Sequence, residues 1–280
     1  MKPDYLEGRP DAMKRDDFAD IDTKTASGAR VYDYLLGGTD NYAIDRAAAD
    51  QVEGILPGTK AMARNSRRFL ERVVRYLAED CGVRQFIDNG SGLPTQDNVH
   101  QIAQRLDPDS RVVYIDSDPI VVRHQKVNAL AENKNTAFIL SDASDVERIL
   151  GHPDTRRLID FGQPTAVLYF MFLHFIPDRS DPGGMVRGMM DRLAPGSYLA
   201  ISHVVSDEAR VRQQMTEVSL ANTRGNFGRI RSREEVRAFF GGLEPAEPGL
   251  VDIRDWRPDG RGEEQAERWF VYGGVARKPA

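Results

Sequence analysis

One stretch decides the fold: Phe86-Ile87-Asp88-Asn89-Gly90-Ser91-Gly92-Leu93-Pro94-Thr95. An apolar run ends at an acidic residue, and two glycines separated by one residue follow it. Because glycine has no Cβ, a chain that turns at these glycines lets a ligand lie directly against its backbone. The carboxylate of Asp88 then faces the cation or hydroxyl that the ligand carries. The stretch predicts a strand that ends in a ligand-binding turn, followed by a helix.

A second apolar run also ends in an acid. Val112-Val113-Tyr114-Ile115 leads into Asp116, which stands about 24 residues beyond Gly92. In nucleoside-binding α/β proteins, the carboxylate that accepts hydrogen bonds from the ribose hydroxyls follows the glycine turn by roughly 20 residues. Two acid-terminated strands in this order, with a helix between them, indicate a nucleoside-binding site.

Strands and helices alternate from residue 83 onward. The expected strands are 84–88, 111–116, 136–140, 165–170 and 197–203. The expected helices are 95–106, 119–131, 144–150 and 183–193. The continuous apolar run Ala166–Phe170 predicts burial on both faces, which is typical of a parallel sheet covered by helices. Two last strands, at 249–256 and 268–276, are expected to form an antiparallel hairpin at one sheet edge.

Three amphipathic helices are expected before the glycine turn, at 27–36, 43–55 and 59–80. The third has an apolar face and, opposite it, arginines that we interpret as a solvated face: Arg64, Arg67, Arg68, Arg72 and Arg75. Residues 1–22 are charged and aperiodic, which predicts a disordered or loosely docked tail. Two Ser-x-x-Glu patterns, Ser144–Glu147 and Ser232–Glu235, predict helix caps.

Composition limits the class of protein. The chain has 280 residues, a net charge of −5 and one cysteine, Cys81. A single cysteine permits no intrachain disulfide and favours a reducing compartment. No run approaches the roughly 20 apolar residues of a membrane span, and the N-terminus lacks the pattern of a signal peptide. We therefore expect a cytoplasmic protein with no metal site and no nucleic-acid or membrane partner, and the sequence leaves the oligomeric state open.

Three segments carry a resemblance to a known family: Ala29–Gly38, Asp88–Thr95 and Leu193–His203. Together with the strand–helix units and the terminal hairpin, they are similar to a bacterial family of S-adenosylmethionine-dependent methyltransferases of unassigned substrate. The resemblance implies an α/β fold with a seven-stranded Rossmann-like sheet, mostly parallel, with helices on both faces. It also implies S-adenosylmethionine as the cofactor, but it names no acceptor.

The resemblance assigns cofactor-binding residues position by position. The glycine loop that holds the methionine moiety matches Asp88, Gly90 and Gly92. The carboxylate that grips the ribose diol matches Asp116, and the adenine contacts match Asp142 and Ala143.

Two departures from the family pattern stand out. Pro94 replaces the third glycine, and Ser117 follows Asp116 at the position where an apolar residue often covers the adenine. Asp118 either shares the ribose or caps the helix that begins at Pro119, and both alternatives stay open.

Two histidines are candidate bases. His174 follows the fourth strand and His203 ends the fifth, so both are expected at the carboxyl edge of the sheet, where ligands bind. The sulfonium is already an activated methyl donor, so a base is needed only if the acceptor arrives protonated. The alternative for each histidine is a structural hydrogen-bonding group.

The resemblance also favours a helical lid over the same edge. The expected division is a tail at 1–22, a lid at 23–65 and a binding domain at 66–280. Tyr42 could offer its ring to the sulfonium, and Arg64 could pair with a carboxylate, so both are expected near the cofactor.

Methyl transfer to a small or medium-sized organic acceptor is the function we expect. The first alternative is a protein that binds S-adenosylmethionine as a regulatory ligand. The second is an NAD-dependent oxidoreductase, which Asp88 disfavours because dinucleotide folds need a small or apolar residue there. Thr95, where a third glycine should stand, and the terminal hairpin also disfavour it.

Overall fold

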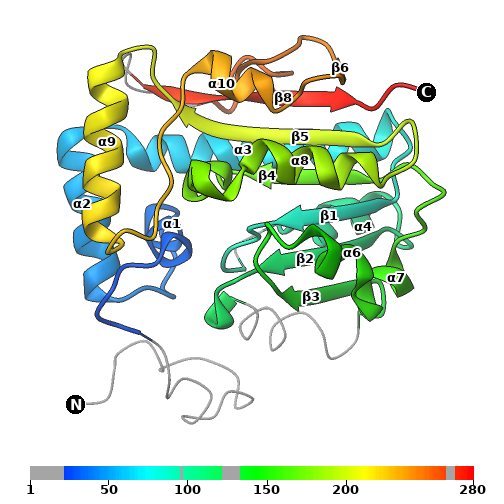
Figure 1. Ribbon diagram of the computed structural model, residues 1–280, viewed down its shortest axis with the longest axis horizontal. Helices are drawn as coiled ribbons and strands as arrows, with labels where there is room; N and C mark the ends of the chain where they lie inside the picture. Colours follow the sequence, from blue (N-terminus) through cyan, green and yellow to red (C-terminus); the bar gives the residue numbers. More distant parts are fainter. Residues whose placement is uncertain (1–21, 95–96, 122–132, 263–268) are drawn as a thin grey trace.

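A computed structural model describes residues 22–94, 97–121, 133–262 and 269–280. Its centre is one sheet in the order β3-β2-β1-β4-β5-β8-β6, with β7 also paired to β8 (Figure 1). The strands are β1 Gln85–Asn89, β2 Arg111–Asp116, β3 Thr136–Leu140, β4 Ala166–Phe170, β5 Tyr198–Val205, β6 Glu244–Pro245, β7 Val251–Asp252 and β8 Phe270–Arg277. The first five are parallel, and β8 runs antiparallel to β5. The predicted fold class is confirmed.

The end of the chain differs in detail from the predicted hairpin. The expected strand 249–256 is reduced to β7, and the unexpected β6 also pairs with β8, which makes eight strands in the sheet. The reason is a turn after Asp252, closed by the Asp255 N–H donating to the Asp252 carbonyl, which directs Trp256 into the core. The Trp256 ring packs edge-on against Phe69, with centroids 5.5 Å apart. Burial of Trp256 ends the strand early.

The helices are α1 Gly28–Leu35, α2 Ala43–Ile55, α3 Thr59–Glu79, α4 Val99–Leu106, α6 Val146–Gly151, α7 Pro153–Leu158, α8 Pro182–Asp191, α9 Ala209–Asn222 and α10 Arg233–Ala238. Two short 3₁₀ turns, η3 Leu173–Phe175 and η4 Asp178–Ser180, follow β4. Most of the predicted helix 119–131 lies outside the described residues, as do residues 95–96 and nearly all of the predicted tail. We did not predict α7 or α9.

One predicted cap is correct and one is wrong. Ser232 and Glu235 form the expected capping box of α10. At α6 the cap is Asp145, whose carboxylate accepts from the Arg148 N–H, and Ser144 instead donates to Asp142. An ionised Asp next to the first turn is the stronger acceptor for a helix N-terminus.

The sheet is buried on both faces. Because successive side chains of a strand point to opposite faces, neighbouring residues pack in different core clusters. Phe86 packs with α3 in one core cluster, and its neighbour Ile87 packs with α8 in the other. Helix α3 is continuous and crosses the expected lid boundary at residue 65.

The arginine face of α3 is not uniformly solvated, which corrects our interpretation of that stripe. Arg72 donates to the carbonyls of Ile253 and Trp256 at 2.6 and 3.0 Å, and its side chain is only 9% exposed. Arg72 therefore holds the turn that follows β7 against the helix.

Candidate functional site

A cavity of about 930 Å³ opens where the parallel strands end. The carboxyl ends of β1, β2 and β4 form one side, and residues of α1, α2, α3 and α9 form the other. Its volume lies in the range of small-molecule sites, and its place at the carboxyl ends of parallel strands is where α/β sheets bind ligands.

The glycine turn forms the floor of this cavity. Gly90 and Gly92 have φ angles of +70° and +67°, which side chains rarely adopt. A Cβ on Gly90 would lie 1.9 Å from the ring of Phe172, whereas one on Gly92 would meet nothing within 4 Å. Gly90 is therefore required for both its backbone angle and its packing, and Gly92 for its angle alone.

Asp88 lies beside this turn as a buried carboxyl. It lines the cavity and is 5% exposed. Burial raises its pKa to about 7, and the neighbouring Arg67 partly opposes the rise. A carboxylate in so buried a position is costly unless a partner compensates it, so this position suits a ligand that brings a cation or a hydrogen-bond donor.

Asp116 is built into the same wall of the cavity. One carboxylate oxygen accepts from the Gly92 N–H and the other from the Asp118 N–H, both at 2.9 Å. Burial nevertheless raises its pKa to about 6. Asp118 accepts from the Ile120 N–H at 3.0 Å, which is the capping arrangement, and also from the Ser27 hydroxyl at 3.0 Å. Ser117 lines the cavity beside them.

The third strand contributes Asp142 and Ala143 to the cavity. Ala143 is buried, and Asp142 is exposed and accepts from both the N–H and the hydroxyl of Ser144. Its side chain therefore stabilises the local turn while standing at the cavity wall.

The two candidate histidines have different surroundings. His174, on η3, lines the cavity and is 5% exposed. His203 is fully buried and does not line it. The His203 Nδ1–H donates to the Val204 carbonyl at 2.6 Å, and its Nε2 stands 3.4 Å from Arg231. Burial lowers the pKa of His203 to about 3 and holds that of His174 well below its ordinary value. These contacts support the structural alternative for His203.

Arg231, which we did not single out in the sequence, positions the segment that carries His174. Its guanidinium is buried and donates to the carbonyls of Leu173 and Ile176 at 2.8 and 3.1 Å. It also pairs with Asp178 at 2.7 Å. No local sequence pattern predicts this role for Arg231, because its partners lie 53–58 positions away in the chain.

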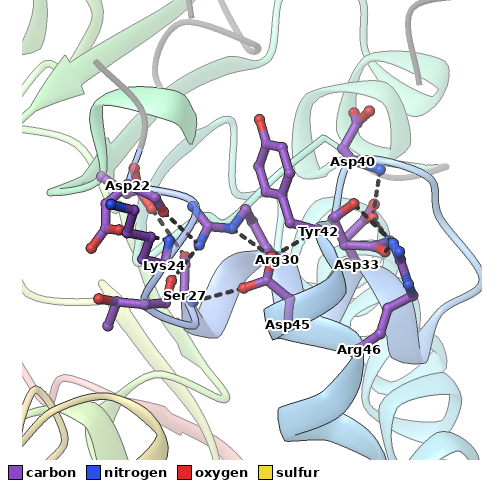
Figure 2. A network of polar contacts seen from close by, with 12 residues as sticks. Asp22, Lys24, Ser27, Arg30, Asp33, Asp40, Tyr42, Asp45 and Arg46 are labelled. Atoms are coloured by element: carbon purple, nitrogen blue, oxygen red, sulfur yellow. Dashed lines mark hydrogen bonds and ion pairs between the residues drawn. The ribbon is translucent and has the colours of Figure 1, made fainter. Parts of the chain in front are cut away.

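A polar network fixes the helices before the glycine turn (Figure 2). The Asp45 carboxylate accepts from Arg30 Nε at 2.8 Å and from the backbone N–H groups of Ser27 and Tyr42. Arg30 lies over the Tyr42 ring, 5.2 Å from its centroid. Tyr42 does not line the cavity, and neither does Arg64, which is exposed. Ser27 connects this network to the β2 end of the site.

Arg67, one turn after Arg64 on α3, does line the cavity. It also donates to the Asp97 carbonyl, at 2.5 Å. The arginine stripe that we identified in the sequence includes Arg67, but its spacing did not indicate which arginine faces the site.

Fold and site together define a Rossmann-like protein with a pocket at the carboxyl ends of its parallel strands. The chain belongs to the S-adenosyl methyltransferase family, whose sequence model matches residues 14–279. A DUF574 family protein from Streptomyces avermitilis MA-4680 is 38% identical, with a TM-score of 0.86, over 92% of this chain and 99% of that one. A candidate methyltransferase from Thermobifida fusca YX is 41% identical, with a TM-score of 0.85, over 92% and 96%. A comparison with curated proteins gives no match.

The cofactor of this family is S-adenosylmethionine, and the residues present fit it. The buried carboxyl of Asp88 suits its ammonium group, the glycine turn admits close approach of a ligand, and Asp116 can accept from hydroxyls. No described group of three or more His, Cys, Asp or Glu residues is arranged to hold a metal ion. None of the described helices is long and apolar enough to cross a membrane.

Replacing Asp88 by asparagine is expected to stabilise the ligand-free protein. Because the folded-state pKa is about 7 and the ordinary value is 3.8, the folded state holds its proton longer than the unfolded state. The ionised carboxyl therefore costs stability increasingly as pH rises from about 4 to 7, and the full cost applies above that. We expect the variant to gain about 1–3 kcal/mol in free energy of unfolding at pH 8 and little at pH 4.

Urea denaturation at both pH values measures this gain. The control is Asp191→Asn, because Asp191 is exposed on α8. A loss of stability at pH 8 in the Asp88 variant would show that the carboxylate is satisfied in the folded protein.

Proposed function

We propose that the protein is an enzyme that transfers the methyl group of S-adenosylmethionine to a small or medium-sized organic acceptor. The observation that carries this proposal is one cavity. The glycine turn and Asp116 line one side of it, and residues of the N-terminal helices line the other. One cavity that holds both partners allows acceptor, methyl carbon and sulfur to be held in line. When bound, the cofactor supplies an activated methyl group on its sulfonium.

The chain's own residues bind the cofactor, orient it and exclude water from it. We assign Asp88 to the ammonium group of the methionine end and Asp116 to the ribose hydroxyls. Arg67 lies near Asp88 and suits the carboxylate of the same end. Asp142 and Ala143 stand at the position for the adenine. The helices α1 and α2 act as a lid that keeps water out.

His174 is our candidate to receive a proton if the acceptor is a hydroxyl or an ammonium group. It is neutral near pH 7 because burial and the neighbouring His203 and Arg231 hold its pKa well below the ordinary value. A group with so low a pKa is a weak base, so we assign most of the rate to positioning.

The affinity for S-adenosylhomocysteine is expected to depend on pH with a defined sign. Ligand ammonium and hydroxyl groups favour the ionised carboxylates, whose pKa values without ligand are about 7 for Asp88 and about 6 for Asp116. Affinity should be full above pH 7. It should fall by about tenfold per unit between pH 7 and pH 6, where Asp88 is protonated in the free protein, and by about a hundredfold per unit below pH 6, where both carboxyls are. Calorimetry from pH 8 to pH 5 measures this, and a flat profile would contradict the assignment of both residues.

Replacing Ser27 by alanine is expected to weaken S-adenosylhomocysteine binding by about 1 kcal/mol. The Ser27 hydroxyl donates to Asp118 at 3.0 Å, and this bond connects the lid to the loop that follows Asp116. Thr23→Ala is the control, because Thr23 is exposed in the same segment. Equal affinities of the two variants would show that the lid contact does not support cofactor binding.

Methyl transfer from labelled donor into panels of metabolites, proteins, DNA and RNA tests the function. The net charge of −5 and the absence of a basic block in the sequence support a small molecule over nucleic acid. Label in nucleic acid would overturn the acceptor class. Tight donor binding with transfer to no member of any panel would favour the regulatory alternative, and preferential binding of NAD would favour the oxidoreductase.

A further inference from the structure

The wall of the cavity opposite the β2 end is built from aromatic rings. Phe175 and Phe227 meet edge to face with centroids 5.2 Å apart, and the His174 ring lies 4.6 Å from Phe175. Trp269, 2% exposed, also lines the cavity. Gly28 of α1 lies against Phe175 so closely that a Cβ there would stand 2.6 Å from the ring. We call this region, with the facing residues of α9, the acceptor chamber. Its packed rings favour a flat, apolar ligand.

The aromatic side of the acceptor chamber carries no charged residue. From Phe170 onward, the described residues that line the cavity include no Asp, Glu, Lys or Arg. His174 is neutral near pH 7 for the reasons given above. An unpaired charge brought into such surroundings loses hydration without gaining a partner, which costs several kcal/mol. The lining of the chamber therefore selects an uncharged group.

The opposite end of the cavity reinforces this selection. The described charged residues that line it are five aspartates and two arginines: Asp33, Asp88, Asp116, Asp118, Asp142, Arg30 and Arg67. A sixth aspartate of the lining, Asp22, is exposed and lies near Arg224, just beyond α9. Arg30 is already paired with Asp45 at 2.8 Å. The excess of carboxylates disfavours an anionic acceptor. The positive sulfonium of S-adenosylmethionine disfavours a second cation in the same cavity. S-adenosylhomocysteine has no such charge, so in its complex only the uncharged lining of the acceptor chamber acts against a cation.

Uncharged polar groups occupy one side of the acceptor chamber. Ser219 and Asn222, from the last turn of α9, line the cavity, as do Thr223 and Asn226 just beyond it. The Thr223 hydroxyl is used within the helix, where it donates to the Ser219 carbonyl at 2.8 Å. Asn222 Nδ2 is buried and has no hydrogen-bond partner among the described residues. A buried amide donor without a partner destabilises the protein, and an oxygen on a ligand removes that cost.

We propose that the methyl acceptor is a neutral aromatic molecule that carries oxygen substituents, bound with its ring against Phe175, Phe227 and Trp269 and its oxygen toward Asn222. This inference rests on the proposed methyl transfer. It adds the substrate class and the residues that select it.

Four probes of similar size test the class by calorimetry on protein saturated with S-adenosylhomocysteine. They are naphthalene-2-carboxamide, its isosteric carboxylate, naphthalen-2-ylmethylammonium and the saturated decahydronaphthalene-2-carboxamide. We expect the aromatic amide to bind at least tenfold more tightly than each of the others. A charged probe or the saturated amide that binds as tightly as the aromatic amide would overturn the proposal, and so would binding of none of the four at millimolar concentration.

A negative charge placed in the acceptor chamber should change the order of affinities among the four probes. Asn222→Asp has nearly the same shape and is expected to weaken the aromatic amide at least tenfold and to strengthen the ammonium probe. Gln214→Glu makes the same change in charge on an exposed position of α9 and should leave the order of the four probes unchanged. Equal behaviour of the two variants would show that Asn222 does not face the acceptor.

The titration with S-adenosylhomocysteine that precedes the probes separates the two proposals. Absence of binding at that stage counts against the proposed function itself. Binding of S-adenosylhomocysteine without the expected preference among the probes leaves methyl transfer standing and refutes the acceptor class.

Discussion

Replacing Asp116 by alanine is expected to weaken binding of S-adenosylmethionine by about 2–4 kcal/mol, which is roughly 30- to 1,000-fold in Kd. The variant removes the carboxylate that we assign to the ribose diol. It also removes the acceptor for the Gly92 and Asp118 N–H groups, so the glycine turn loses a support at the same time. The two losses act on the same ligand, which makes the expected effect on binding large for a single residue.

The fold should survive this change, and calorimetry with a thermal melt measures both properties. Because burial raises the pKa of Asp116 to about 6, its ionised form is not a net source of stability near pH 7. Asp109→Ala is the control, since Asp109 is exposed just before the other end of β2. Unchanged affinity in the Asp116 variant would move the ribose contact to another residue, with Asp118 the next to test.

The sequence was sufficient to predict the parallel part of the sheet. The five predicted strands agree with β1 to β5 within two residues at each end, because each is a buried apolar run with little competing signal. The two acids at the ends of β1 and β2 also line one cavity, as their spacing indicated. Adjacent parallel strands end at the same edge, so residues at their carboxyl ends meet without further information.

Features that depend on distant contacts could not be predicted in this way. Helix α9 buries only Val211 and Met215, so its apolar periodicity is weak, and part of its remaining surface lines the cavity. Strand β7 ends early because Trp256 packs against α3, a contact across nearly 190 positions of the chain. Neither cause is visible in a local window of sequence.

For the same reason, the cofactor side of the candidate site could be predicted from the sequence and its acceptor side could not. A glycine turn and a strand-end acid are local signals, whereas Trp269, Asn222 and Phe227 reach the cavity from separate segments. Tyr42 and Arg64 were expected near the cofactor because the resemblance favours a lid over the site. Neither residue lines the cavity: Arg30 lies over the ring of Tyr42, and Arg64 is exposed.

Replacing Gly90 by alanine is expected to lower the free energy of unfolding by about 2–5 kcal/mol and to abolish cofactor binding. A side chain at φ +70° costs about 1–2 kcal/mol in backbone strain. The new Cβ would also stand 1.9 Å from the Phe172 ring, which itself stacks on Tyr169, and relieving such overpacking costs about 1–3 kcal/mol more. Urea denaturation measures the sum.

Gly92→Ala separates the two causes, because Gly92 has nearly the same φ, +67°, and open space where its Cβ would stand. We expect this variant to lose only the backbone part, about 1–2 kcal/mol. In a double-mutant cycle, Phe172→Ala should recover most of the difference for Gly90→Ala, since it removes the ring that the new methyl group meets. Equal losses at the two glycines would mean that Phe172 moves aside without cost, and the turn would then require glycine for its backbone angles alone.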